Sequence, residues 1–166
     1  MSFPVTIEGR NGDQYHHSAT KKLPFGTVMR LPDGRELAYA RAGAGALAAG
    51  VVTQEAVVIS GHTKDLAVAA AAAIGATQVT ITNSTTAITA NMYAEGYLFV
   101  NNEAGEGYSY KIKSHPAEST GSGSCVITLE DEDALRVALT TASKVGLRKH
   151  ECDGLLVAPT TATGIV

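Results

Sequence analysis

The sequence has few of the aromatic residues and cysteines that stabilise the folds of small proteins. It has no tryptophan, only two cysteines in 166 residues and an aromatic fraction of 5%. Cys125 and Cys152 lie far apart and outside any CxxC spacing, which excludes a disulfide framework and a cysteine zinc site. A single disulfide and two free thiols both fit this spacing, and free thiols are favoured.

Long hydrophobic runs are missing as well. The longest apolar run, from Leu66 to Gly75, is too short and too rich in alanine to span a bilayer. The first ten residues, MSFPVTIEGR, lack the apolar core of a signal peptide. We therefore expect neither a signal peptide nor a membrane partner.

The chain has no strong excess of positive or negative charge. The formal net charge is -3, the isoelectric point is about 5.9 and no basic block occurs, so nucleic acid is not expected as a direct ligand. The hydrophobic fraction is 45%, but much of it is alanine, which buries little area. Because such a core buries little apolar area, we expect the fold to be stabilised by contact with the surface of a partner.

The strongest structural pattern is Glu95–Lys113, where two β-like runs flank a polar turn. The runs are Gly96–Asn101 and Tyr108–Lys113, and the residues between them include two glycines. In the second run Tyr108, Tyr110 and Ile112 alternate with Ser109, Lys111 and Lys113. This period of two predicts an antiparallel hairpin with one face in the core.

Further β signals follow along the chain. Pro32-Asp33-Gly34 stands between two alternating runs, Gly26–Leu31 and Arg35–Arg41, and predicts a second hairpin. Other strands are expected at Ala56–Ser60, Gln78–Thr82, Cys125–Leu129 and Leu155–Pro159. Strands spaced about 8–15 residues apart predict a mainly β fold, a compact β-sandwich or β-barrel over residues 23–166.

Three segments have two interpretations each. Leu66–Ile74 fits a strand or an alanine-rich helix, and the β-formers after it favour the strand. Ala134–Val145 fits one helix, or a turn followed by strands at 136–139 and 144–147, and Thr140-Thr141 favours the strands. Gly43–Gly50 superficially resembles a phosphate-binding loop, but its third glycine is displaced and no helix follows, so a bend of small residues is favoured.

Residues 1–22 are expected to form an extended N-terminal arm. Phe3, Val5 and Ile7 alternate, and polar residues follow, so the segment has too little apolar area to fold alone. We predict that these three side chains are interface residues that anchor the arm to the surface of a larger assembly or to a neighbouring subunit.

No set of residues predicts catalysis, a cofactor or a metal. The histidines are not spaced as convergent ligands and are expected at the surface: His16, His17, His62, His115 and His150. Ser122 and Ser124 do not match the nucleophile elbow, and Cys125 begins a β run like a small core residue. Glu103, Glu106 and the acidic run Asp131–Asp133 are expected in solvated loops.

Several stretches together resemble the capsid decoration, or cement, proteins of tailed bacteriophages. They are LPDGRELAYARAG (31–43), ALAAG (46–50), VTQ (52–54), GATQVTIT (75–82) and AEGYLFVNNEAGEGYSYKI (94–112). The similarity in residue order covers roughly residues 23 to 160.

The resemblance implies a structural virion protein without enzymatic activity. It implies that the chain is made in the host cytoplasm, binds the outside of an assembled head as a trimer and stabilises contacts between major capsid subunits. The other functions to weigh are a tail-associated receptor- or polysaccharide-binding β module and, less favoured, a polysaccharide-degrading enzyme. The enzyme would need acids clustered in one groove, and a fibre module would show internal repeats, of which there are none.

Overall fold

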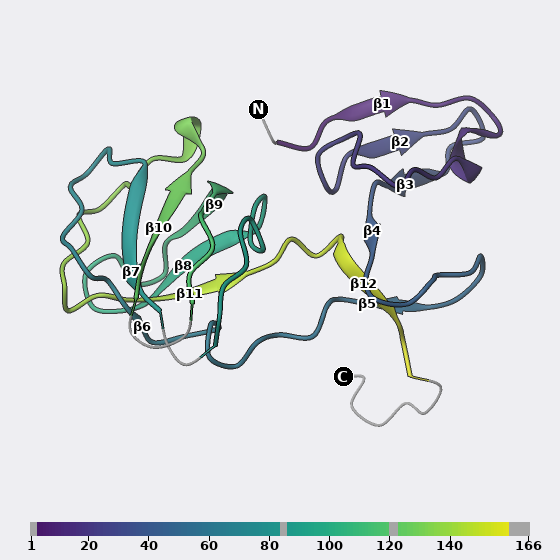
Figure 1. The fold of residues 1–166 in the computed structure, drawn as a ribbon. Coiled ribbons are helices and arrows are strands. Elements are labelled where there is room, and N and C mark those ends of the chain that lie inside the picture. Colours follow the sequence, from purple (N-terminus) through teal and green to yellow (C-terminus); the bar gives the residue numbers. More distant parts are fainter. Residues whose placement is uncertain (1–2, 84–85, 120–122, 160–166) are drawn as a thin grey trace. The chain divides into compact units, whose positions relative to one another are not determined.

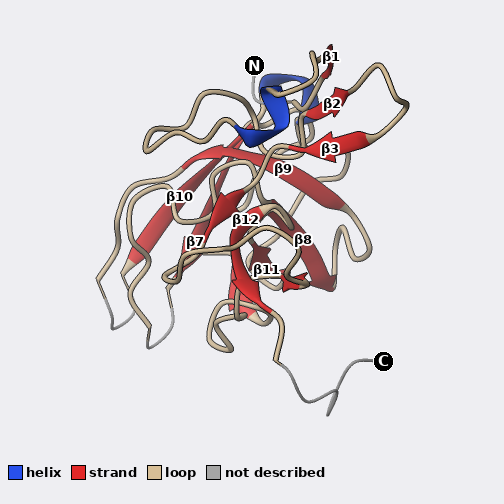
Figure 2. Cartoon of the chain, turned by 90° about the vertical axis from the view of Figure 1, so that its right-hand side faces the viewer, coloured by secondary structure: helices blue, strands red, loops and turns tan. Residues whose placement is uncertain are grey.

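The computed structural model describes residues 3–83, 86–119 and 123–159, and within them the chain is mainly β (Figure 2). Two 3-10 helices, η1 (Asp13–Tyr15) and η2 (Asp131–Asp133), have three residues each. No helix of the described part is long and apolar enough to cross a membrane. The predicted mainly β class is confirmed.

The chain divides into two compact units. Val58–His150 forms the first, which we call the barrel unit. Phe3–Val57 and the described residues from Glu151 onward form the second, which we call the two-sheet unit. The boundary predicted at residues 22 and 23 does not coincide with this division.

The barrel unit contains six antiparallel strands in the order β6-β11-β8-β9-β10-β7 (Figure 1). In chain order the strands are β6 (Leu66–Ala67), β7 (Gln78–Thr82), β8 (Tyr97–Asn102), β9 (Ser109–Ser114), β10 (Ser124–Leu129) and β11 (Lys144–Arg148). A β-bridge between Val68 and Ile81 joins the two edges, so the sheet is nearly a closed barrel.

The core of the barrel unit comes from the inward residues of these strands. Tyr110, Ile112, Leu98 and Val100 are buried on the central hairpin, as the alternation predicts. The other strands add Val79, Ile81, Cys125, Ile127, Leu129, Val145 and Leu147. Each large side chain contributes about 1.5–3 kcal/mol when fully buried, so this is the stable part of the molecule.

The predicted central hairpin is confirmed, but two of its side chains depart from the expected pattern: Tyr108, expected on the core face, is 43% exposed, and Lys111 is buried. Strands β8 and β9 pair antiparallel, with Tyr97 opposite Lys111. Lys111 was expected to face solvent, but it is buried. Its ammonium donates to the Glu95 carbonyl at 3.1 Å and lies 5.2 Å from the centre of the Tyr97 ring. A lysine is buried here because its charge has a carbonyl and an aromatic face beside it.

Leu66–Ile74 and Ala134–Val145, the two segments that could have been helices, are extended or irregular, and Gly43–Gly50 contains bends and turns. Leu66–Ala67 is strand β6, and Ala72 forms a bridge with Leu139. The strand expected at 136–139 is therefore reduced to one bridge, whereas the strand expected at 144–147 is present as β11. Small alanine side chains allow this close passage between neighbouring segments.

The two-sheet unit holds two three-stranded sheets. One has the order β1-β2-β3, with β1 (Thr6–Glu8), β2 (Val28–Arg30) and β3 (Glu36–Ala38). The other has the order β4-β12-β5, with β4 (Arg41–Ala42), β12 (Asp153–Val157) and β5 (Thr53–Gln54). The predicted hairpin is confirmed as β2–β3, and Gly34 takes the positive φ of 85° that its turn requires.

Two expectations for this unit are not confirmed. An arm without local order is not observed, because β1 pairs in parallel with β2 from Thr6 opposite Val28 to Glu8 opposite Arg30. The strand expected at Ala56–Ser60 is absent, since this stretch has no ladder partner and leaves Val57 and Val58 exposed. Apolar β-formers alone do not make a strand without a neighbouring strand to bond.

Candidate binding surfaces

The histidines do not assemble a metal site. Among the described residues, no group of three or more histidine, cysteine, aspartate or glutamate side chains is placed to hold a metal ion. His16 and His17 are exposed, as expected. The expectation of surface histidines is wrong for His62, His115 and His150, which are buried. The ring nitrogens of His62 and His115 have hydrogen-bonding partners inside the barrel unit, and the ring of His150 stacks on Tyr97.

The other candidate nucleophiles and acids are scattered. Ser122 lies outside the described residues, whereas Ser124 is exposed at the start of β10. Glu103 and Glu106 are exposed in the turn between β8 and β9. These positions bring no base and no nucleophile together.

The acidic run at η2 serves the structure of its neighbours. Asp131 accepts a hydrogen bond from Lys113 at 2.8 Å, which raises the pKa of that lysine. Asp133 accepts the backbone N–H of Lys111 at 2.5 Å. Two of the three acids therefore tie η2 to strand β9, and the run is more than a solvated loop.

Both cysteines are free thiols, as favoured from the sequence. Burial raises the pKa of Cys125, and burial also raises the pKa of Cys152. Each thiol is thus held in its protonated form at neutral pH, which is the unreactive form.

A buried polar group links three residues that we call the histidine cluster: His62, Tyr93 and His115. The Tyr93 hydroxyl lies 2.7 Å from His62 Nδ1, and His62 Nε2 lies 2.9 Å from the Thr86 carbonyl oxygen. The Tyr93 backbone N–H donates to His115 Nε2 at 3.0 Å, and His115 Nδ1 lies 2.9 Å from the Pro116 carbonyl oxygen.

The partners determine the protonation of both rings. A carbonyl oxygen only accepts, so His62 carries its proton on Nε2 and His115 carries its proton on Nδ1. The other nitrogen of each ring then accepts from Tyr93, through the hydroxyl for His62 and through the amide for His115. Burial raises the pKa of Tyr93 to about 12, so its hydroxyl remains a donor. Both nitrogens of each ring are occupied, which leaves neither free as a metal ligand or a catalytic base.

An open depression lies on the outer face of the barrel sheet. It has a volume of about 450 Å³ and is lined by Tyr97 and Phe99 of β8, Ser109 of β9 and Arg148 of β11. The register places Arg148 opposite Tyr97, and Ser109 opposite Phe99. Tyr97 and Phe99 alternate with the buried Leu98 and Val100, and this alternation is the sign in the sequence of a second, outward face of β8.

The predicted interface residues Phe3, Val5 and Ile7 lie in the two-sheet unit. Phe3 and Ile7 are half-buried, and Val5 is 50% exposed beside strand β1. The Val5 carbonyl oxygen accepts the N–H of Val28 at 2.9 Å, so its backbone belongs to the first sheet. Their proposed role in anchoring stays a prediction.

The two-sheet unit buries little of its own apolar surface. Only four of its described residues are buried: Phe25, Thr27, Leu31 and Asp153. It leaves large apolar side chains exposed: Val5, Tyr15, Leu37, Val51, Val52, Val57 and Val157. Val52 and Val157 lie at the same end of the β5–β12 ladder, because Val157 pairs with Thr53 and the Ala158 N–H donates to the Val52 carbonyl oxygen. Val57 and Val157 belong to runs that were expected to form strands, whereas the adjacent Val51 and Val52 had no predicted role.

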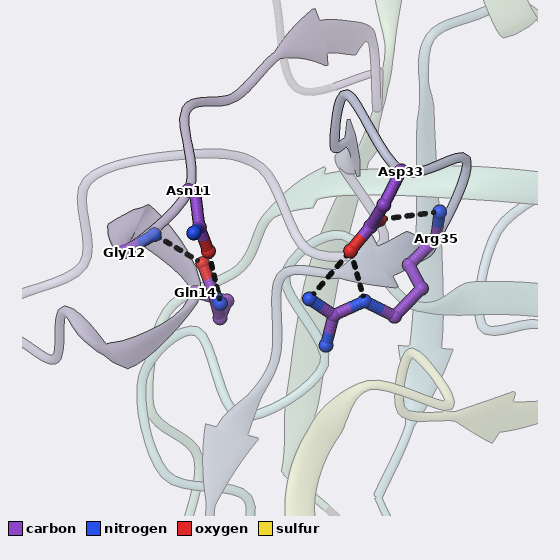
Figure 3. A network of polar contacts seen from close by, with 5 residues as sticks. All are labelled: Asn11, Gly12, Gln14, Asp33 and Arg35. Carbon is purple, nitrogen blue, oxygen red and sulfur yellow. Dashed lines mark hydrogen bonds and ion pairs between the residues drawn. The ribbon is translucent and has the colours of Figure 1, made fainter.

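Polar contacts elsewhere in this unit stabilise turns. Gln14 accepts the Gly12 N–H at 2.7 Å and contacts Asn11, while Asp33 and Arg35 form an exposed ion pair at 2.7 Å (Figure 3). The hydrogen bond from Arg35 is the main cause that lowers the pKa of Asp33. Each set bonds within one turn, and their dipoles and charges are already neutralised locally.

Comparison with protein-family models, with curated proteins and with solved structures gives no match for this chain.

Proposed function

We propose that this protein is a structural virion protein that binds the outer surface of an assembled phage head and stabilises contacts between major capsid subunits. The observation that carries the proposal is the contrast between the two units. The barrel unit has a full core, whereas the two-sheet unit buries four described residues and leaves seven large apolar side chains exposed. A unit built this way gains stability when another protein covers it.

The exposed side chains suit contact with a large assembly. Val52, Val57 and Val157 are aliphatic and at least 48% exposed, and each would contribute about 1.5–3 kcal/mol if fully buried on a partner. The exposed charges of Arg30, Glu36, Asp33 and Arg35 are paired within the unit, so docking does not need a charged partner to neutralise them. Several such weak contacts, repeated over many copies on one head, hold the capsid subunits together. The sequence resemblance supplies the identity of the partner, the major capsid protein, and favours a trimer.

The test measures occupancy on heads stripped of the protein. Val52→Asp and Val5→Asp place a carboxylate on the two-sheet unit, and Ile74→Asp is the matched control on the barrel unit. Val52 is 73% exposed and Ile74 is 69% exposed, so neither change disturbs a core. We expect Val52→Asp to lower occupancy about tenfold or more. A tenfold change corresponds to about 1.4 kcal/mol of binding free energy. Burying an unpaired carboxylate costs more than this, so the expected loss is a lower bound.

The control decides how a loss is interpreted. Ile74→Asp should bind heads like the unchanged protein, and sedimentation of the free protein gives its oligomeric state. Equal occupancy for Val52→Asp and Ile74→Asp would remove the two-sheet unit from the interface. Unchanged binding by Val5→Asp alone would remove the predicted role of Phe3, Val5 and Ile7. The proposal assigns no catalytic activity to the chain.

A second candidate is a polysaccharide-binding module, favoured by the depression on the barrel unit. Two aromatic side chains, the Ser109 hydroxyl and the Arg148 guanidinium line it, which provides faces for sugar rings and donors for their hydroxyl groups. Titration with capsular oligosaccharides, followed by NMR shifts, would move Tyr97, Phe99 and Ser109 amides if this candidate holds. Shifts confined to other residues, or none, would exclude it.

A further inference from the structure

We propose that His115 is a proton-sensitive residue that holds the segment Thr86–Glu95 on the end of strand β9, and that protonation of its Nε2 releases this segment. The inference concerns the barrel unit alone and does not depend on the proposed function. It follows from the direction of each hydrogen bond in the histidine cluster.

The segment is attached to the end of β9 at several points near His115. The Asn91 N–H donates to the His115 carbonyl oxygen, and the His115 N–H donates to Asn91 Oδ1, both at 3.1 Å. Ile88 forms a bridge with Glu118 a few residues further along. Tyr93 adds the bond from its amide to the His115 ring at 3.0 Å. The hydrogen bond to the His115 ring is thus one of several that hold the segment Thr86–Glu95 against the end of β9.

Protonation affects the two histidines of the cluster differently. A proton on His62 Nδ1 meets the Tyr93 hydroxyl, whose oxygen can turn and accept it. A proton on His115 Nε2 meets the Tyr93 backbone N–H, which has no lone pair to offer. Two donors then face each other in a buried site, and the bond is lost with no rearrangement to replace it. His115 is therefore the sensitive residue, and His62 is the tolerant one.

The surroundings do not compensate a positive charge on His115. The titratable groups of the described residues nearest to it are Tyr93 and His62 of the cluster and Cys125 of β10, whose thiol contacts the same Pro116 carbonyl oxygen as His115 Nδ1. The carboxylate of Glu118 acts on Cys125 rather than on His115. Both ring nitrogens bond to backbone groups, so no carboxylate is bonded to the ring. Burial lowers the pKa of His115; the Pro116 carbonyl raises it by less, and His62 lowers it again.

The sign of the pH effect follows. The folded protein binds the proton less readily than an unfolded chain, whose histidine has a pKa of about 6.5. The stability contributed by neutral His115 is complete above that value and is lost as the pH falls through the lowered pKa of the folded state. Acidification therefore opens the segment, and neutral pH closes it.

Hydrogen exchange measured residue by residue tests the proposal. Between about pH 7.5 and about pH 5, we expect the protection of the Tyr93 amide, corrected for intrinsic exchange, to fall about tenfold or more, the factor that corresponds to one pKa unit. His115→Gln keeps an acceptor for that amide but cannot be protonated, so it should abolish the fall. His62→Gln is the matched control and should retain it. An acid-induced fall of equal size in His115→Gln overturns the proposal.

The unchanged protein provides a second readout if His115→Gln does not fold. Long-range ¹H–¹⁵N spectra report which nitrogen of each ring carries the proton. We expect Nδ1–H for His115, Nε2–H for His62, and a Tyr93 amide shift that follows the titration of His115. An Nε2–H tautomer for His115, or a Tyr93 amide that does not follow this titration, overturns the proposal.

Discussion

Changing Gly146 to alanine should lower the free energy of unfolding of the barrel unit by about 3 kcal/mol, at the upper end of the usual cost of overpacking. Gly146 lies on strand β11 opposite Phe99 of β8. A β-carbon there would overlap the Thr63 carbonyl oxygen and the ring of Phe99. The ring could turn aside, but the carbonyl belongs to the backbone and cannot move without shifting its segment. The strand or the segment at Thr63 must therefore be displaced.

Urea denaturation followed by tyrosine fluorescence measures this effect. Gly45→Ala is the matched control, because Gly45 has no positive φ and no atom within 4 Å of an added β-carbon. The control should unfold at the same urea concentration as the unchanged protein. A Gly146→Ala protein as stable as Gly45→Ala would show that β11 and Thr63 can separate at little cost.

The central hairpin was predictable because the residues that specify it lie close together in the sequence. Tyr110 and Ile112 alternate with polar residues, and the turn between the strands is rich in glycine, so pairing and inward face both follow from the sequence. Lys111 was not predictable in the same way. Its burial depends on Tyr97 across the strand pair and on the Glu95 carbonyl, and no alternation rule contains those partners.

The candidate surfaces were harder to predict than the strands. The histidine cluster joins positions 62, 93 and 115, and each bond crosses more than 20 residues of chain. The exposure of the aromatic pair Tyr97 and Phe99 could not be predicted, because it depends on whether another layer covers the outer face of β8. Exposed Val57 lies in the run Ala56–Ser60, which was wrongly predicted to be a strand, since a strand needs a partner that the sequence does not name.

The two-sheet unit is the part of the structure that the sequence predicted least well. Its second sheet pairs β4 with β12, so Arg41 meets Asp153 across 112 positions. Nothing in either local sequence indicates this contact. The predicted arm was also assigned from its own composition, whereas its order comes from a parallel partner strand, β2. Long-range pairing therefore organises the half of the molecule that has the thinnest core.

Replacing Arg41 with methionine should destabilise the two-sheet unit by about 3 kcal/mol, because it leaves a buried carboxylate without its cation. Arg41 bonds to Asp153 at 2.6 Å, and Asp153 is 2% exposed. The guanidinium also lies 5.2 Å from the centre of the Phe25 ring, one of the few buried side chains of this unit. With so little core to offset the loss, the unit should unfold while the barrel unit remains folded.

Hydrogen exchange resolved by segment distinguishes the two units in this variant. We expect the amides of β4, β5 and β12 to lose protection in Arg41→Met, while those of β8, β9 and β10 keep it. Arg30→Met is the matched control. Arg30 also bonds a carboxylate, that of Glu36 at 2.7 Å, but both side chains of this pair are more than half exposed. Such a surface pair contributes little, so this control should exchange like the unchanged protein. Equal protection in Arg41→Met and Arg30→Met would mean that the burial of Asp153 does not make its ion pair necessary, and that the second sheet is held by its backbone ladder alone.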